Sequence, residues 1–453
     1  MRVTDESGSG CVWTAADAQT HPAPRVYALD IVVPDEGDPL VVDVNGARSG
    51  VEPQRLLHGD DRVQEAVLTP LAEAGGGVIT TVSQTTPAPL QDRFCAARLR
   101  LAGSRCGWYE AADAYVPVGD PAARGREQLP AATARRLGID YRAVTVDWRE
   151  DRFVVLDRGK TCDLRDWRPE GIVWPYAWDQ RVLPLPLDVP VCNPLPYSLP
   201  TTNKLLANHL LADVGVPPTR PAGLWLPGSP LLAEQAAGPR RLTVVKPAVG
   251  RRSFGVVLTP TERLPEIAPD LGLVSARAGL DRTAELTVLG LLWGQATELL
   301  ALAQPYVPPR LRRHPETGAM HTSIARATVV VERDVPRCVD VCAFLVPEPH
   351  GSTRGGLMLT GAGGAAVVAL ADGEALEVRR AAETVVARLE EAVRTRLRGP
   401  SGAEIVRAEI GLMVELLEAG TDCPVDRAWQ AHRDTITGYE AFDPGYTNER
   451  AKA

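Results

Sequence analysis

Residues 242–258 read LTVVKPAVGRRSFGVVL, and this segment decides the fold prediction. Its apolar start predicts a strand that ends at Lys246, and a loop with Gly250, Ser253 and Gly255 leads into a second strand. A lysine at the end of a strand can place its ammonium on a phosphate, over which a glycine loop can fold its backbone N–H groups. The segment is not a Walker loop, because no G-K-[ST] sequence opens a helix. A plain hairpin with a surface lysine stays an open alternative.

Two further elements, one before this segment and one after it, carry candidate ligand-binding residues. Lys204 lies in the first turn of a helix predicted over residues 202–214. Downstream, the stretch AQPYVP carries Gln304, Tyr306 and Val307, which could form a purine-binding hinge. Each element is weak alone, because a lone lysine in a first helical turn is usually solvated.

Near the N-terminus, residues 27–50 read YALDIVVPDEGDPLVVDVNGARSG and predict an antiparallel hairpin. Asp30 lies on the first strand, and Asp43 and Asn45 lie on the second. The two-residue period of a strand places Asp43 and Asn45 on one face. Carboxylate and amide oxygens suit Mg²⁺, so these three residues are candidate metal ligands. The alternative is an ordinary hairpin in which Asn45 and Gly46 form a turn.

Composition narrows the function classes. The 453 residues correspond to roughly three domains, and 49 basic against 57 acidic residues give a net charge of −8. An acidic chain is a poor nucleic-acid binder. No apolar run predicts a membrane span, and the polar first ten residues show no secretory signal, so we expect a cytoplasmic protein. The eight cysteines show no C-x-x-C spacing; Cys338 and Cys342 would share one face of a strand.

Periodicity predicts an α/β protein with α+β lobes. The predicted strands cover residues 26–33, 40–44, 77–82, 141–147, 152–156, 171–176, 242–246, 255–258, 325–333 and 339–346. The predicted helices cover residues 61–74, 90–102, 202–214 and 375–398. Three breaks divide the chain: the proline-rich residues 182–200, which read as an extended connection, and residues 307–314 and 399–402.

The order N-K, V-V-K-P-x-x-G-x-x-x-x-G, Q-x-Y-V over about 105 residues resembles the ATP-grasp superfamily. The G-V-P-P-T sequence at residues 215–219 also matches the segment that usually follows the first lysine. The resemblance implies two lobes that clamp ATP, with Lys204 and Lys246 on its phosphates.

The superfamily usually carries an E-x-N metal motif near its C-terminus, and this chain lacks one there. Asp43-x-Asn45 at the other end supplies the pattern, which resembles the circularly permuted ATP-grasp ligases of the glutathionylspermidine synthetase type. The implied parts are a permuted metal-binding segment of the C-lobe (1–60), a pre-ATP-grasp α/β domain (61–200), the N-lobe (201–315), and the remaining C-lobe with C-terminal helices (316–453).

Shorter matches extend the likeness. Residues 45–50 match the family's D-N-x-x-P-S-G, with Arg48 in place of proline, and residues 94–103, 193–204, 339–344 and 355–357 match further family segments. Two positions depart: the family's strand arginine is Cys342, and its T-R is Met358-Leu359. The arginines that could replace them are Arg337, Arg354, Arg310 or those of the glycine loop.

The resemblance implies a ligase that joins a small carboxylic acid to an amine through an acyl phosphate, with ATP and Mg²⁺ as cofactors and release of ADP. Amino-acid-like substrates of a specialised pathway would fit. The implied roles are Mg²⁺ on Asp30, Asp43 and Asn45, nucleotide on Lys204, Lys246, Gly250, Ser253, Gly255, Gln304, Tyr306 and Val307, and the acyl group beside Arg48, Ser49 and Arg354.

Three alternatives stay open. In an unpermuted ATP-grasp ligase, residues 410–417 would form the metal strand, with Glu409 or Glu415 as ligand. A degenerate ATP-grasp protein would bind nucleotide without catalysis. An unrelated α/β enzyme would match the lysine and glycine pattern by chance.

Overall fold

The structure is a computed structural model whose three sheets and helices make the protein a mixed α/β fold. It describes residues 23–46, 57–84, 106–107, 130–147, 152–155, 161–163, 167–175, 189–212, 214–216, 220–224, 242–247, 256–260, 300–346, 349–350, 366–399, 405, 408–409 and 412. Among these residues no helix is both long and apolar enough to cross a membrane.

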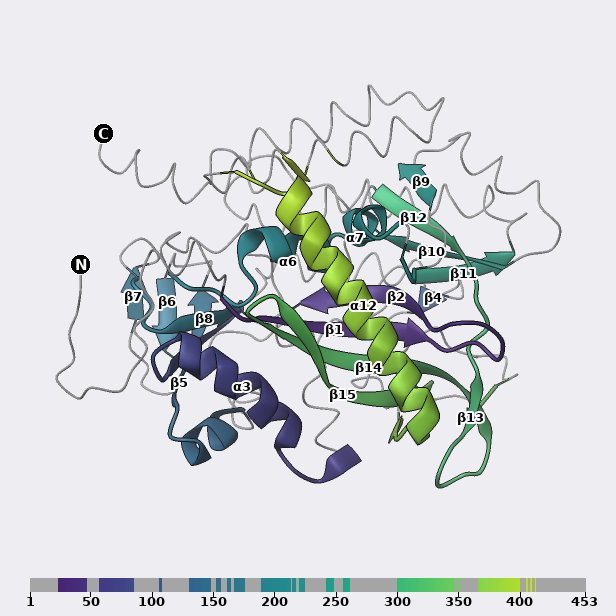
Figure 1. Ribbon diagram of the computed structural model, residues 1–453, viewed down its shortest axis with the longest axis horizontal. Coiled ribbons are helices and arrows are strands. Elements are labelled where there is room, and N and C mark those ends of the chain that lie inside the picture. Colours follow the sequence, from purple (N-terminus) through teal and green to yellow (C-terminus); the bar gives the residue numbers. More distant parts are fainter. Residues whose placement is uncertain are drawn as a thin grey trace.

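The central sheet joins the N-terminal hairpin to strands from late in the chain (Figure 1). Its strands run in the order β16 (Ala366–Val368), β15 (Val335–Leu345), β14 (Met320–Glu332), β1 (Arg25–Val32) and β2 (Leu40–Gly46), and β13 (Leu311–Arg313) pairs with β14. All of these pairings are antiparallel. The first described strand therefore lies between its own hairpin partner and a strand about 300 residues downstream.

One face of this sheet is covered by the helix α12 (Asp372–Arg396), which crosses in front of β1 and β14 in Figure 1. Tyr27, Leu29 and Ile31 of β1 pack in one core with Val385 and Leu389 of α12. Because side chains alternate along a strand, residues 28, 30 and 32 point to the opposite face. That opposite face carries the candidate site.

Two β-bulges adjust which side chains reach that face. Between β1 and β2 the register shifts so that Val42 has no partner between Val41 and Asp43. Between β14 and β15 the register shifts at Val339. Bulges of this kind re-aim side chains and expose backbone groups that the ladder would otherwise use.

The second sheet contains the strand that ends near Lys246. It runs β4 (Cys106–Gly107), β11 (Val256–Pro260), β10 (Leu242–Pro247), β12 (Leu300–Pro305) and β9 (Arg220–Leu224), with antiparallel pairing throughout. The expected hairpin of β10 and β11 is confirmed. Residues 248–255, which hold the glycine loop, lie outside the described residues.

The third sheet is mixed. It runs β7 (Thr161–Asp163), β6 (Arg152–Val155), β5 (Asp140–Asp147), β3 (Val78–Gln84) and β8 (Ile172–Pro175). β3 is parallel to both β5 and β8, and the other pairs are antiparallel. The helix α3 (Arg62–Ala74) packs its apolar side with Ile79 and Ile172 of this sheet and with Val26 of β1, so one core connects the third sheet to the central sheet.

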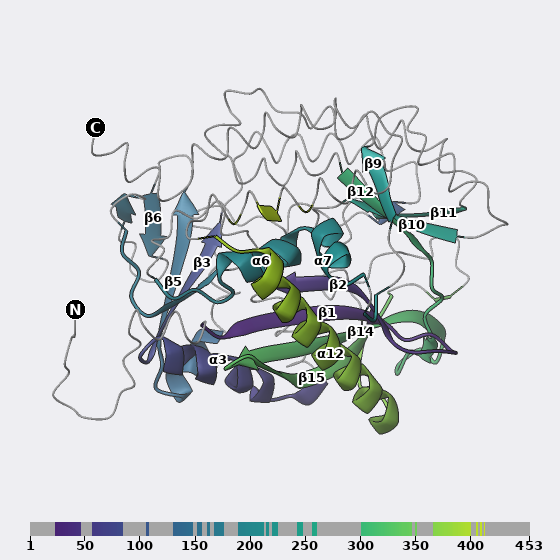
Figure 2. The same ribbon diagram turned by 45° about the horizontal axis from the view of Figure 1, so that its top comes forward.

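Two short helices connect the three sheets. α6 (Leu195–Thr202) and α7 (Lys204–Leu210) lie beside β2 in both ribbon views (Figure 2). Gly46 of β2 faces Thr201 so closely that a Cβ at residue 46 would lie 2.4 Å from the threonine hydroxyl. Glycine therefore permits the close approach of α6 to β2.

Most predicted elements are confirmed within one to three residues, the strands predicted from residues 325 and 339 begin earlier, at Met320 and Val335, and two predictions were wrong. Residues 195–202 form α6 rather than an extended connection, because Pro196 falls in the first turn, where proline needs no N–H partner. The break at residues 307–314 contains the short strand β13. The helix predicted over residues 202–214 begins at Lys204 and ends at Leu210. The helix expected over residues 90–102 lies outside the described residues.

Candidate functional site

Asp30 and Asp43 are direct cross-strand partners on the face of the central sheet opposite α12. Their neighbours Leu29 and Val44 point the other way, into the core beneath α12. Asn45 shares the face of the two acids, because its Nδ2 lies 3.4 Å from Oδ2 of Asp30. The structure thus places these three predicted side chains together on one face.

The four carboxylate oxygens of this pair have different surroundings. Oδ1 of Asp30 accepts hydrogen bonds from Nε of Arg326 at 2.8 Å and from its terminal nitrogen at 2.6 Å. Oδ2 of Asp43 lies 3.4 Å from Nζ of Lys204. Oδ1 of Asp43 is buried and has no hydrogen-bond partner within the described part of the chain. Burial raises the pKa of Asp30, while Arg326 opposes that rise.

Lys246 reaches the same place from the second sheet. Its Nζ donates a 2.9 Å hydrogen bond to the carbonyl of Val42, the residue at the bulge of β2. Burial, aided by the charge of Lys204, lowers the pKa of Lys246 to about 8 against the opposing effects of Asp43 and Asp30. Two lysines and two carboxylates from three distant segments thus form one partly desolvated charge cluster.

Local capping places Lys204 as the first residue of α7. Asn203 is the N-cap, and its side-chain oxygen accepts a 3.1 Å hydrogen bond from the amide of Leu206. The side-chain nitrogen of Asn203 donates to Glu409 at 3.1 Å. The cap and its buried acid therefore fix the turn from which the ammonium of Lys204 points to Asp43.

Gln304 lies on the same face of the second sheet as Lys246. Gln304 is paired with Val244, two residues before Lys246, and the two-residue period turns both side chains to one side. Nε2 of Gln304 donates to Oδ1 of Asn208 at 3.0 Å, and Nδ2 of Asn208 donates to the carbonyl of Lys204 at 2.7 Å. A chain of hydrogen bonds thus links the candidate hinge to a candidate phosphate-binding lysine.

No family model matches the sequence, and no curated protein is similar to it. Among solved structures, the chain is similar to D-cycloserine synthetase DcsG at 13% identity and a TM-score of 0.36, covering 69% of this chain and 82% of that one. It is also similar to a RimK domain ATP-grasp protein from Sphaerobacter thermophilus at 13% identity and a TM-score of 0.23, covering 70% and 99%. These TM-scores are too low to assign an activity, so the functional conclusion depends on the residues of the site.

The other predicted site residues are placed in part. Tyr306 and Val307 follow the end of β12, where the chain passes from the second sheet to the central sheet; burial raises the pKa of Tyr306, and Val307 packs beside Phe344. Six predicted residues lie outside the described residues: Arg48, Ser49, Gly250, Ser253, Gly255 and Arg354.

The cluster fits a hard divalent cation. Two carboxylates and one amide converge on one face, and a buried carboxylate oxygen of Asp43 lacks a partner among the described residues. Oxygen ligands of this type suit Mg²⁺. No group of three or more His, Cys, Asp or Glu side chains gathers in the described ranges, so a cation here would draw further oxygens from water or from a phosphate.

Sequence reasoning missed Arg326. Register aligns Asp43, Asp30, Arg326 and Cys342 in one row across four strands. The guanidinium of Arg326 lies 5.0 Å from the ring centroid of Phe344 and donates to Asp30. A signal was present: between Thr322 and Val331 of β14, Arg326 is the lone charge among apolar and hydroxylic residues, where an unpaired cation would be costly.

Two of the arginines that could replace the one missing at Cys342 lie within the described residues, and both lie away from the acid pair. Arg337 pairs with Glu332 at the surface, 3.2 Å away. Arg310 donates to the carbonyl of Pro34 and lies 3.5 Å from Asp35. Arg326, the direct strand partner of Cys342, is therefore the described arginine that reaches the acid pair.

Two further sequence predictions were wrong. Cys338 packs in the core with α12, whereas Cys342 packs with Phe344 on the opposite face, because the bulge at Val339 breaks the two-residue period between them. The alternative metal strand over residues 410–417 is not supported by its described residue, because Leu412 is helical, as is the preceding Glu409.

Proposed function

We propose that this protein is an ATP-dependent carboxylate–amine ligase of the ATP-grasp type. The observation that carries the proposal is the approach of two lysines from separate segments to one strand: Lys204 lies 3.4 Å from Oδ2 of Asp43, and Lys246 bonds to the carbonyl of the adjacent Val42. Two cations beside a carboxylate pair suit a polyphosphate that binds together with a divalent metal.

The proposed arrangement is circularly permuted. β1 and β2 supply the acids from the start of the chain, and they pair with β14 in one sheet. An unpermuted chain would need acids on C-terminal strands, whereas Glu409 lies in a helix and bonds to Asn203. This supports the segment before residue 61 as part of the C-lobe and residues 61–200, with their parallel strands, as a pre-ATP-grasp domain.

In the proposed site, Lys204 and Lys246 bind the phosphates, and Gln304, Tyr306 and Val307 lie at the hinge that would hold the base. Asp30, Asp43 and Asn45 would hold Mg²⁺, which when bound supplies positive charge to the phosphoryl oxygens. Arg48, Ser49 and Arg354 stay proposed contacts of the acyl group, and Gly250, Ser253 and Gly255 stay proposed members of a phosphate-covering loop.

The proposed reaction begins with attack of a substrate carboxylate on the terminal phosphorus of ATP. An acyl phosphate forms and ADP leaves; an amine then displaces phosphate, and the product is an amide. Catalysis of this type depends on positioning and on cations that balance the charge of the transferred group. Small amino-acid-like acids and amines of a specialised pathway are the proposed substrates.

ADP release tests the proposal. The full chain is incubated with Mg²⁺-ATP, each proteinogenic amino acid as the acid, and hydroxylamine as the acceptor, because hydroxylamine traps an acyl phosphate as a hydroxamate, which forms a coloured complex with added ferric ion. We expect ADP release that requires one acid, with an equal amount of hydroxamate. ATP binding by calorimetry without acid-dependent ADP release from this panel, widened to dipeptides, would overturn the ligase assignment.

A nucleotide-binding protein without ligase activity is the second candidate. It is favoured by Cys342, which stands where the resembled family has an arginine, and by the ion pair of Asp30 with Arg326, which already neutralises one candidate metal ligand. The same experiment separates the two candidates, because this one predicts ATP binding with no hydroxamate for any acid.

A further inference from the structure

Asp340 lies on the same face as the acid pair, in the next row across the central sheet. The register aligns Asn45 with Ala28, Ala28 with Thr328, and Thr328 with Asp340. Asp340 is also two residues from Cys342, the strand partner of Arg326. Burial raises the pKa of the Cys342 thiol between the two rows; Asp340 and Asp30 add to that rise, and Arg326 opposes it.

The carboxylate of Asp340 holds a histidine. Its Oδ1 lies 2.9 Å from Nε2 of His58, and its Oδ2 is buried with no hydrogen-bond partner in the described ranges. The Asp340 side chain is 6% exposed and that of His58 is 21% exposed. Burial raises the pKa of Asp340, and the contact with His58 opposes that rise. The acid is therefore enclosed, while the imidazole reaches solvent.

The neighbour of His58 fixes the imidazole over this face. Leu57 packs against the cluster of Val32, Ile324, Cys342 and Phe344, which borders the acid row. Nε2 is the ring atom of His58 that contacts Asp340. A carboxylate accepts hydrogen bonds, so in the tautomer in which Nε2 donates to Asp340, Nδ1 carries the lone pair.

We propose that His58 is the general base of the amide-forming step and that Asp340 is its positioning residue. This inference rests on the proposed function, because it assigns a base to the second half of that reaction. A carboxylate behind an imidazole fixes the tautomer and the ring orientation, as base-orienting acids do in other enzymes. An amine acceptor needs such a base, since α-amino and lysine amines have reference pKa values of about 8 and 10.4 and are mostly protonated at pH 7.

In the amide-forming step, Nδ1 of His58 takes one proton from the ammonium group of the acceptor. The lone pair freed on the amine nitrogen then forms the C–N bond to the acyl carbon. The C–O bond to the phosphoryl group breaks, and its electron pair leaves with the phosphate. The second proton of the amine nitrogen passes to the departing phosphate oxygen. No oxidant, reductant or further reactant is needed.

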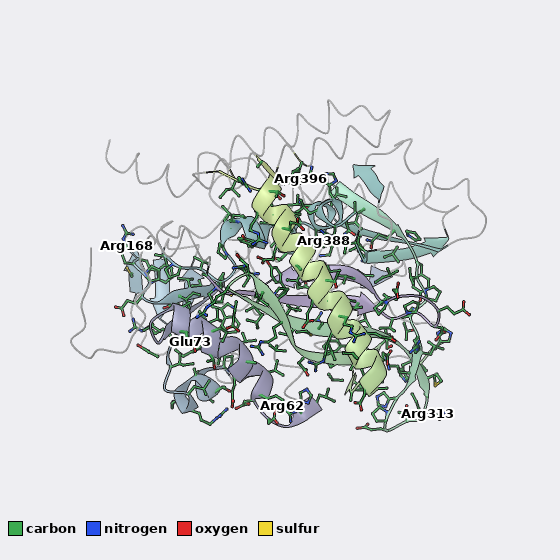
Figure 3. All side chains as sticks on the ribbon, in the orientation of Figure 1. Arg62, Glu73, Arg168, Arg313, Arg388 and Arg396 are labelled. Atoms are coloured by element: carbon green, nitrogen blue, oxygen red, sulfur yellow. The ribbon has the colours of Figure 1, made fainter. Side chains whose placement is uncertain are left out.

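Charged groups on the adjoining elements also act on this dyad. Asp60 lies in the turn before α3 and Arg62 at its start, and the charge of Arg379 on α12 lowers the pKa of Asp340. Figure 3 shows Arg62 where α3 begins. Asp60 and Arg62 bond to each other at the surface, so their charges are largely balanced.

Comparing two amine acceptors distinguishes a general-base role of His58 from a structural one. Hydroxylamine is uncharged at neutral pH and needs no base, whereas an alkyl amine does. With the acid found by ADP release, we expect His58→Gln to slow amide formation from alkyl amines about 100-fold at pH 7, within the usual range for a general base. Hydroxamate formation should stay unchanged, and the loss for alkyl amines should shrink as the pH rises toward the pKa of the amine. His350→Gln, at an exposed histidine, is the matched control.

If His58→Gln slows hydroxamate formation and amide formation equally, or slows neither reaction, the proposed role of His58 is overturned. Asp340→Asn should show the same split with a smaller loss, because the imidazole stays while its orienting charge is removed. If the wild-type chain forms neither product, the proposed function fails; if it forms both and the split is absent, only this inference fails.

Discussion

Arg326 lies directly opposite Cys342 in the pairing of β14 with β15, and its guanidinium donates to Asp30. The position that holds an arginine in the resembled family is thus a buried thiol here, and the cation comes from the neighbouring strand. The charge stays in the same row of the sheet although the residue that supplies it differs.

The first prediction concerns that ion pair. Arg326→Ala should abolish ADP release and lower the free energy of unfolding by about 3–5 kcal/mol, because it leaves Asp30 buried without its cation. Urea denaturation measures the stability. Arg337→Ala, which removes the exposed pair with Glu332, should change it by less than about 1 kcal/mol. Equal effects of the two variants would contradict a buried role for Arg326.

The second prediction concerns the partnerless oxygen of Asp43. Asp43→Asn keeps the size of the side chain and removes one of the two negative charges of the Asp30–Asp43 pair. The rate of ADP release should therefore fall by about 100-fold or more, the magnitude typical of lost electrostatic stabilisation. Asp38→Asn, in the exposed turn between β1 and β2, is the matched control. Retained activity in Asp43→Asn would rule out the permuted metal site.

The third prediction concerns pH. Because the pKa of Lys246 is lowered to about 8, its charge is complete below that pH and is lost as the pH rises through it. The affinity for ATP should therefore weaken above pH 8, by about tenfold per unit where binding requires the charged form. Lys246→Arg should bind ATP with a flat profile over the same range, since guanidinium stays charged. A profile that does not differ between the two proteins would contradict the contact.

The same shift affects stability with a definite sign. A lysine whose folded pKa lies below its unfolded value of about 10.4 binds fewer protons in the folded state between those two values. The contribution of Lys246 to folding therefore becomes more favourable as the pH rises from about 8 to about 10.4. Lys246→Met should lose this part of the pH dependence in urea denaturation.

The fourth prediction concerns the hydrogen bonds from Gln304 to Asn208 and on to the carbonyl of Lys204. Asn208→Leu removes both hydrogen bonds. Because the net contribution of buried hydrogen bonds to the free energy is small, we expect the KM for ATP to rise by about tenfold. Asn208→Asp keeps the acceptor for Gln304 and should lose less. If Asn208→Leu lowers kcat with no change in the KM for ATP, the link between hinge and lysine is wrong.

The strands and the acid face could be predicted from the sequence because they depend on local patterns. Alternation placed Asp43 and Asn45 on one face, and the turn at residues 35–39 fixed the hairpin. The approach of Lys204 and Lys246 to this hairpin followed from the family resemblance, since no local pattern predicts a contact across about 200 residues.

The other features of the fold and the site depend on long-range strand register. Cys338 and Cys342 lie on opposite faces of β15 because of the bulge at Val339, and no residue type in the sequence predicts that bulge. Arg326 reaches Asp30, and His58 reaches Asp340, only through pairing and packing with residues far along the chain. The charge of Arg326 among the apolar and hydroxylic residues 322–331 was an available signal, whereas no local pattern marks His58.

Calorimetric titration of Mg²⁺-ATP shows whether acids of the N-terminal hairpin and two distant lysines form one nucleotide site. We expect one molecule of Mg²⁺-ATP to bind per chain, with binding weakened at least about tenfold by Asp43→Asn and by Lys246→Gln and unchanged by Asp38→Asn. Absence of binding to the wild-type chain, or equal affinity in all four proteins, would contradict this expectation.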